Sequence, residues 1–90
     1  MPPHQATLAE LAMNQTHIVS AVAVPAHAPE WARWLEEIGF IPGELVTLVA
    51  RGMLGGDPLV VRVGSSTFAL RRAEAACVHV RKGPILPDTR

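Results

Sequence analysis

The corner at residues 39–43, Gly-Phe-Ile-Pro-Gly, constrains the fold more than any other part of this sequence. It follows a segment in which large apolar side chains recur at helical spacing: Trp31, Trp34, Leu35 and Ile38. Such a stripe predicts an amphipathic helix, and Gly39 suits the left-handed position just beyond its end, with Phe40 folding back onto the last turn. Pro42 and Gly43 fit the two central positions of a type II turn, because Pro fixes φ and Gly accepts a positive φ. The sequence therefore predicts a helix stop followed at once by a sharp turn into a strand.

The rest of the chain alternates short, Val-rich segments with turn residues. These segments have strand length and many β-branched residues, which predicts strands over residues 17–24, 45–50, 58–64, 67–70 and 77–80. The helix falls between the first two strands, within residues 26–40, and short helical turns are expected after Thr7 and over residues 71–76. Five short strands joined by close turns are typical of a small closed barrel rather than an open sheet. In the first strand, alternation predicts Ile18 and Val22 on one face and His17 on the other.

Composition excludes several classes of protein. The 90 residues hold 8 Lys and Arg against 8 Asp and Glu, so no net charge draws the chain onto nucleic acid or anionic lipid. No stretch approaches the roughly 18 apolar residues of a membrane-spanning helix, and the N-terminus lacks the pattern of a signal peptide. Cys77 is the single cysteine, which excludes an internal disulfide and fits a reducing compartment. We therefore expect a soluble, cytoplasmic protein that neither binds nucleic acid nor inserts directly into a membrane.

The sequence shows no arrangement typical of an enzyme. Its Ser and His residues have no recognisable nucleophile and base spacing. The segment Met53-Leu54-Gly55-Gly56-Asp57 is glycine-rich, but it lacks the Lys-Ser/Thr of a phosphate loop and is followed by a strand rather than a helix. A hairpin connection is the simpler interpretation of this segment.

The histidines allow two interpretations. None of His4, His17, His27 and His79 lies three or four residues from another His or from Cys77, so no preformed metal-binding set is visible. The first and last strands of a five-stranded barrel often neighbour each other, which would bring His17 and His79 together on the outside. A weak surface site for a divalent metal and ordinary solvent-facing histidines therefore both remain open.

Trp34 also allows two interpretations. It lies at the margin of the apolar stripe, which the other three side chains can anchor without it. It can pack in the core, or it can stand partly exposed, and Trp is enriched among the residues that dominate protein interfaces.

Four segments, in this order and spacing, resemble the FeoA family of small cytoplasmic proteins of bacterial ferrous iron uptake: LAEL, RWLEEIGFIPGELVTLV, LGGDPLVVRV and FALRRAEA. The resemblance runs from about Thr7 to Val80, so the domain is expected over residues 7–80, between a flexible N-terminus at residues 1–6 and a flexible C-terminal tail at residues 81–90. It implies an SH3-like barrel that is not an enzyme and acts with the membrane permease FeoB, whose cytosolic part carries a GTPase domain. One departure is Trp34, which stands where relatives usually carry a charged residue and so supports the interface interpretation.

Two hypotheses about function follow. In the first, the chain is a noncatalytic regulatory protein that binds the cytosolic portion of the permease and modulates its assembly or transport. The contact residues expected for it are Glu30, Arg33, Trp34 and Glu37 on the helix and Met53, Leu54, Gly55, Gly56 and Asp57 in the loop. In the second, the chain is a metal-responsive module that binds Fe(II), or Zn(II) in its place, and forms a homodimer. The metal ligands expected for it are His17, His27 and His79. The first hypothesis requires no cofactor.

Overall fold

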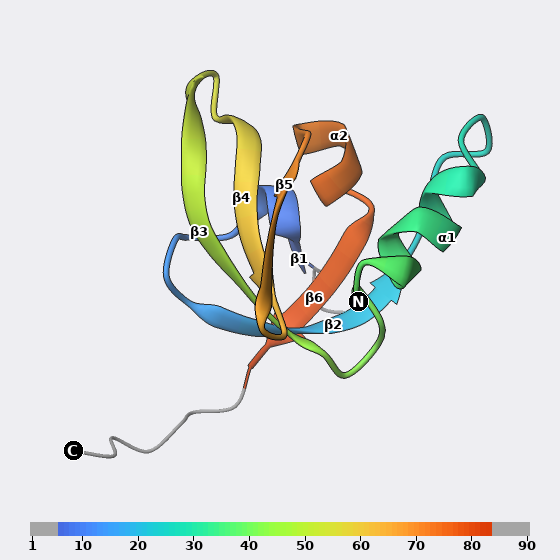
Figure 1. Cartoon of the computed structure of the whole chain (residues 1–90), viewed down its shortest axis with the longest axis horizontal. Coiled ribbons are helices and arrows are strands. Elements are labelled where there is room, and N and C mark those ends of the chain that lie inside the picture. Colours follow the sequence, from blue (N-terminus) through green and yellow to red (C-terminus); the bar gives the residue numbers. More distant parts are fainter. Residues whose placement is uncertain (1–5, 84–90) are drawn as a thin grey trace, which may run out of the picture.

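The structure is a computed structural model that describes residues 6–83, apart from the side chain of Leu54 (Figure 1). The elements in chain order are β1 (Ala6–Thr7), η1 (Leu8–Glu10), β2 (Thr16–Val22), α1 (Glu30–Glu37), β3 (Leu45–Leu54), β4 (Asp57–Val63), β5 (Ser66–Leu70), α2 (Arg72–Ala75) and β6 (Val78–Lys82). The strands form one antiparallel sheet with the order β1-β6-β2-β3-β4-β5. This sheet curls into a small barrel, and α1 stands to one side of it (Figure 1).

The strands agree with the sequence prediction except near the two ends of the described chain. All five predicted strands are present, and a sixth, β1, is added because Ala6 and Thr7 pair with Val80 and His79 of β6. Strand β6 continues to Lys82, so Ala6 and residues 81–82 belong to strands rather than to the predicted flexible ends. The rest of those predicted ends, residues 1–5 and 84–90, lies outside the described residues.

Strand β3 is longer than the sequence predicts. It continues through Leu54 instead of ending near Ala50, and its pairing with β4 shifts register twice, between Leu48 and Ala50 and between Arg51 and Leu54. Such irregularities let a strand bend and twist without losing its partner. The glycine-rich loop is therefore reduced to a tight turn at the tip of a long hairpin.

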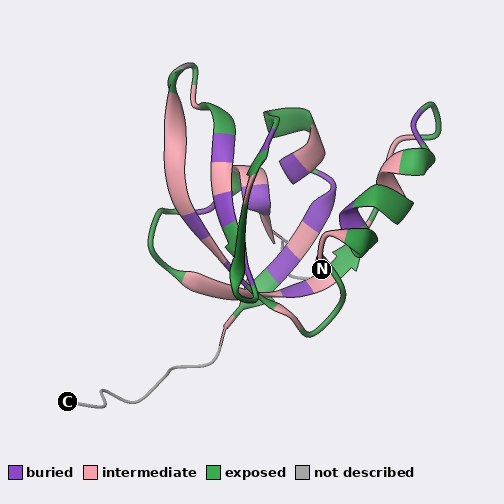
Figure 2. Ribbon diagram, in the orientation of Figure 1, coloured by how far each residue is buried: buried purple, intermediate pink, exposed green. Residues whose placement is uncertain are grey.

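The core fills the inside of the barrel (Figure 2). Its fully buried side chains come from every long strand and include Val19, Leu48, Val61 and Val80. The predicted inward face of the first strand holds for Val22, which packs against the core, but not for Ile18, because Val19 is buried while Ile18 is only half-buried. A bulge between Val19 and Ala21 interrupts the alternation.

The corner after α1 forms as the sequence predicts. Gly39 has a φ of +121°, and the N–H of Phe40 donates to the carbonyl oxygen of Leu35 at 2.9 Å, as in a Schellman cap. The φ of Gly43 is +95°, and the N–H of Glu44 donates to the carbonyl oxygen of Ile41 at 3.0 Å, which closes the type II turn. Phe40 is buried, so the corner holds the end of α1 against the barrel.

Candidate partner-binding surface

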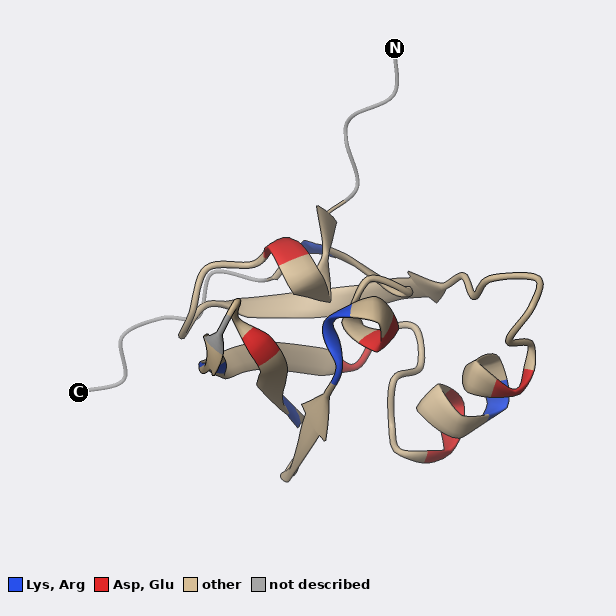
Figure 3. Cartoon of the chain, turned by 90° about the horizontal axis from the view of Figure 1, so that it is seen from above, with Lys and Arg blue, Asp and Glu red and all other residues tan. Residues whose placement is uncertain are grey.

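Helix α1 presents the four predicted contact residues to solvent. Glu30, Arg33, Trp34 and Glu37 are all exposed. Arg33 Nε lies 3.8 Å from Glu37 Oε2, but both side chains are so exposed that this pair adds little stability. The surface carries acids on both ends of the helix with one base between them (Figure 3).

The two Trp residues of α1 have different environments. Trp31 is partly buried against the core, and its ring meets that of His27 edge to face, with centroids 6.5 Å apart. Trp34 is 38% exposed. Of the two interpretations of Trp34, the structure supports exposure and contradicts a place in the core, while a role at an interface stays a prediction.

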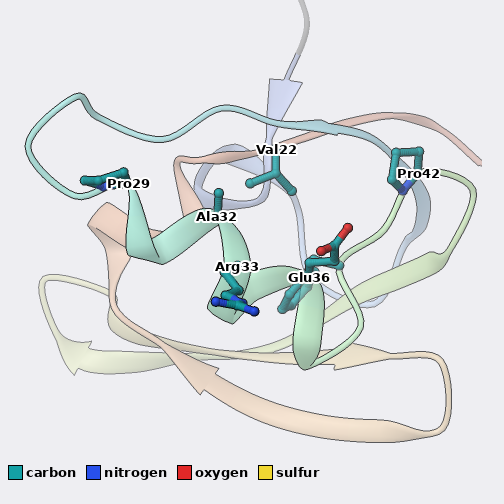
Figure 4. Close-up of a pocket in the computed structure, with 7 residues that line it drawn as sticks. Val22, Pro29, Ala32, Arg33, Glu36 and Pro42 are labelled. Atoms are coloured by element: carbon teal, nitrogen blue, oxygen red, sulfur yellow. The ribbon is translucent and has the colours of Figure 1, made fainter.

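A groove of about 480 Å³ lies on the other side of α1, where the helix faces the end of β2 and the corner. Figure 4 shows Pro29 and Pro42 at its two ends, with Val22 and Ala32 between them. Its lining is completed by Arg33, Glu36 and Phe40. Only Arg33 among these was predicted as a contact residue. The sequence signal that could have indicated a groove here is Ala32, a small side chain in the helical segment that lies between Pro29 and Pro42.

The second predicted contact region lies elsewhere on the molecule. Met53, at the end of the β3–β4 hairpin, is 99% exposed, and Gly55 and Asp57 are exposed beside it. The side chain of Leu54 lies outside the described part of the structure. Asp57 Oδ1 accepts a hydrogen bond from the N–H of Arg72 at 3.0 Å, which ties the hairpin to α2. The hairpin tip and α1 stand at opposite sides of the barrel, so the two regions do not form one surface (Figure 1).

The predicted histidines are not brought together. Strands β2 and β6 are neighbours, as expected, but His17 lies opposite Lys82 whereas His79 lies opposite Ala21. His27 is on the loop before α1 and contacts Trp31. Within residues 6–83, no group of three or more His, Cys, Asp or Glu side chains is placed to hold a metal. His4 lies outside the described residues.

His79 is enclosed more than a surface ligand would be. It lies between Thr7 of β1 and Ala21 of β2, and its Nδ1 is buried without a hydrogen-bond partner among residues 6–83. The sixth strand, which the sequence did not predict, accounts for this enclosure. His17 Nδ1 lies 3.3 Å from the carbonyl oxygen of Gln15 and remains partly exposed.

Cys77 is a buried core residue. Its Sγ lies 3.4 Å from the carbonyl oxygen of Ala73, and only 5% of the residue is exposed. Burial, and secondly the negative charge of Glu74, raises the pKa of the Cys77 thiol. A protonated, enclosed thiol is a poor nucleophile and a poor metal ligand.

A family model for the FeoA domain matches residues 6–82 of this chain. The chain belongs to the FeoA family. The match covers nearly the whole described part, and it confirms the family resemblance drawn from the sequence. No curated protein matches the chain by sequence. No helix in residues 6–83 has the length and apolar character needed to cross a membrane.

Solved structures agree with this assignment. The zinc complex of FeoA from Stenotrophomonas maltophilia is 43% identical to this chain, with a TM-score of 0.77, over 84% of this chain and 89% of that one. That protein is described as a procaryotic SH3 domain protein and a candidate activating factor of ferrous iron transport. FeoA from Chlorobium tepidum is 27% identical, with a TM-score of 0.75, over 86% of this chain and 70% of that one. The SH3-like fold expected from the sequence is thereby confirmed.

The same fold occurs in a different context. A manganese-dependent transcriptional repressor has a TM-score of 0.74 over 91% of this chain and 44% of its own, at 21% identity. This likeness concerns the fold alone, and the function has to be argued from this chain's own surface.

Proposed function

We propose that this chain is a noncatalytic, cytoplasmic accessory protein of ferrous iron uptake. In this proposal it binds the cytosolic part of a FeoB-type permease and modulates its assembly or transport. The observation that carries the proposal is the exposed Trp34 on a helix beside the barrel, in a member of the FeoA family. Trp is enriched at interfaces and among the residues that dominate their binding energy, which supports a contact role for Trp34.

The charges of α1 indicate the chemistry of the partner's surface. Glu30, Glu36 and Glu37 stand against Arg33 alone, so the helix surface is acidic around an aromatic side chain. A complementary site is an apolar pocket for Trp34 with Lys or Arg at its rim. Charges at a rim mainly raise the rate of association, whereas the buried aromatic side chain slows dissociation.

The groove adds a second part to this surface. Ala32, Phe40 and Pro42 give it apolar walls, and it opens on the side of α1 away from Trp34. An apolar side chain of the partner can enter the groove while Trp34 enters the partner. Contact on both sides of α1 fixes the orientation of the complex better than either contact alone.

The test is a titration of isotope-labelled chain with the cytosolic GTPase portion of the permease, followed by NMR. We expect shifts centred on α1 and the groove, and at least about tenfold weaker binding for Trp34→Ala. The melting temperature of Trp34→Ala should fall less than that of Leu35→Ala, because Trp34 is 38% exposed whereas Leu35 is fully buried. Met13→Ala is the matched control, since Met13 is 49% exposed but lies on neither predicted surface.

Three results would count against this surface. If Met13→Ala and Trp34→Ala weakened binding to the permease portion equally, the loss would be one of nonspecific hydrophobic binding rather than of a specific contact. Shifts confined to the hairpin around Met53 would move the interface to the second predicted region. The absence of any shift would contradict the proposed partner.

Metal-responsive dimerisation is a second candidate, and one observation favours it: the Stenotrophomonas maltophilia relative is complexed with zinc. In this chain the candidate ligands are separated, so a metal would need donors from two molecules. We expect an ion held this way to shift the ring signals of His17 or His27 and to increase the molecular mass on adding Zn(II). The ligand is identified by comparing the variants His17→Ala, His27→Ala and His79→Ala. If the chain stays monomeric on adding Zn(II) and the NMR signals of its His rings do not shift, this candidate is excluded.

A further inference from the structure

The groove beside α1 combines apolar walls with one uncompensated charge. Val22, Ala32 and Pro42 give it apolar atoms, and Glu36 lines it with a carboxylate. Figure 4 shows this carboxylate turned toward Val22 and Pro42. Among residues 6–83, no basic side chain forms an ion pair with Glu36. The groove therefore offers a partner a negative charge next to apolar surface.

Arg33 also lines the groove but leaves the charge of Glu36 available. Its Nε lies 3.8 Å from Oε2 of Glu37, four residues further along α1. Glu37 is not one of the lining residues, so the charge of Arg33 is directed to a carboxylate outside the groove. In Figure 4 the guanidinium of Arg33 is turned away from Val22 and Pro42. The charge that remains among the apolar walls is negative.

We propose that the groove takes a lysine side chain of the protein partner, with its aliphatic stem along the apolar walls and its ammonium group against Glu36. This inference rests on the proposed function and names the side chain that enters the groove. A lysine carries a compact charge on a flexible four-carbon stem, and such stems cover apolar surface while the charged end stays at a polar group. One side chain thus matches both the walls and the carboxylate.

Other side chains fit this lining less well. A purely apolar side chain would cover Glu36 and leave its charge with neither water nor a partner, which costs free energy. An arginine gains from stacking its planar guanidinium on an aromatic face. Phe40 is the aromatic residue of the lining, and it is only 1% exposed, so its ring offers no such face. The aliphatic walls and the single carboxylate therefore favour lysine.

The charge is tested with Glu36→Gln, which keeps the size of the side chain and removes its negative charge. We expect at least about fivefold weaker binding of the cytosolic GTPase portion of the permease, because a hydrogen bond between charged groups is lost. Glu30→Gln is the matched control, since Glu30 is exposed on the same helix but does not line the groove. It changes the net charge equally and should weaken binding less than about twofold.

The space for the lysine stem is tested with Ala32→Leu. Leucine is a strong helix former, so α1 should remain folded while the larger side chain occupies the groove. We expect at least about fivefold weaker binding of the permease portion, because the aliphatic stem loses its contacts with the walls. Ala32→Ser leaves the groove open and is the matched control. Melting temperatures of both variants show that they are folded.

The lysine itself is identified by cross-linking the complex with a carbodiimide. This reagent joins a carboxylate and an amine in contact as an amide, and it does not join a guanidinium. Peptide mass spectrometry should find Glu36 linked to a lysine of the permease portion, and this link should be absent in Glu36→Gln. The measurement does not depend on whether Ala32→Leu folds.

Three results would overturn this inference and leave the proposed function in place, provided that Trp34→Ala still weakens binding. The first is binding by Glu36→Gln as tight as that by Glu30→Gln. The second is binding by folded Ala32→Leu as tight as that by Ala32→Ser. The third is cross-linking of partner lysines to Glu30 or Glu37 but not to Glu36. If the unchanged chain does not bind the permease portion at all, the proposed function fails and this inference fails with it.

Discussion

The barrel and helix α1 belong to one small domain but are stabilised in different ways. In the barrel, each long strand shares backbone hydrogen bonds with a neighbour and contributes fully buried side chains, among them Val19, Leu48 and Val61. Helix α1 belongs to no sheet, and Leu35 is its only fully buried residue (Figure 2). We therefore expect the barrel to be the more stable unit, whereas α1 depends on Leu35, on the partly buried Trp31 and Ile38, and on the corner that follows.

This difference matters for function because binding surfaces are often the less stable parts of a fold. The exposed Trp34 and the groove both lie on α1 or against it. A helix held at few points can adjust to a partner while the barrel keeps its shape.

The largest expected effect is at the centre of the barrel. Leu48 is fully buried in β3, and Leu48→Ala should lower the free energy of unfolding by about 3 kcal/mol or more through lost burial and the cavity left behind. Urea denaturation measures the loss. The control is Leu45→Ala on the same strand, where the side chain is 40% exposed and the loss should stay below about 1 kcal/mol. Similar losses for the two variants would contradict the burial pattern of β3.

A smaller and more local effect is expected at the anchor of α1. Leu35→Ala should cost about 2 to 3 kcal/mol in the contacts that hold the helix. Hydrogen exchange should then show faster exchange in α1, while the amides of β3 and β4 keep their protection. Faster exchange throughout the chain would show that helix and barrel unfold as one unit.

The same contrast explains what the sequence could and could not predict. The helix stop and the turn at residues 39–43 depend on local backbone preferences of Gly and Pro, so they were predicted correctly. The positions of the five main strands followed from β-branched residues and turn spacing. These signals are local, and each is contained in a few neighbouring residues.

Features that depend on distant residues were not predictable. The bulge after Val19 and the pairing of Ala6 with Val80 arise only when β2, β6 and the N-terminal segment come together. The register of β2 against β6 also depends on distant residues, and it places His17 opposite Lys82, so the predicted proximity of His17 and His79 failed. The groove beside α1 was missed because its walls come from β2, the helix and the corner.

The corner itself provides a third and smaller test of how α1 is held. Gly39→Val should lower the free energy of unfolding by at least about 1 kcal/mol, because a β-branched residue is strained at a φ of +121°. The added Cβ would also approach Val63 Cγ2 at 3.4 Å, which is tight. Gly43→Val separates the two causes, since Gly43 has a φ of +95° and no neighbouring atom within 4 Å of an added Cβ. Unchanged stability in Gly39→Val would contradict the helix stop.

The smallest expected effect concerns Cys77 and the interior of the barrel at high pH. Its pKa is raised, mainly by burial, so the folded chain keeps the thiol proton to a higher pH than the unfolded chain does. Above about pH 8.5 the unfolded chain loses this proton first, and the free energy of unfolding therefore falls as the pH rises through the folded pKa. Below about pH 8.5 the stabilisation from the protonated, buried thiol of Cys77 is fully present.

The measurement for Cys77 is the difference in unfolding free energy between the unchanged chain and Cys77→Ala from pH 7 to 10, which subtracts all other titrating groups. A difference that does not change with pH would mean that the barrel admits water at Cys77 and is looser there than its contacts indicate.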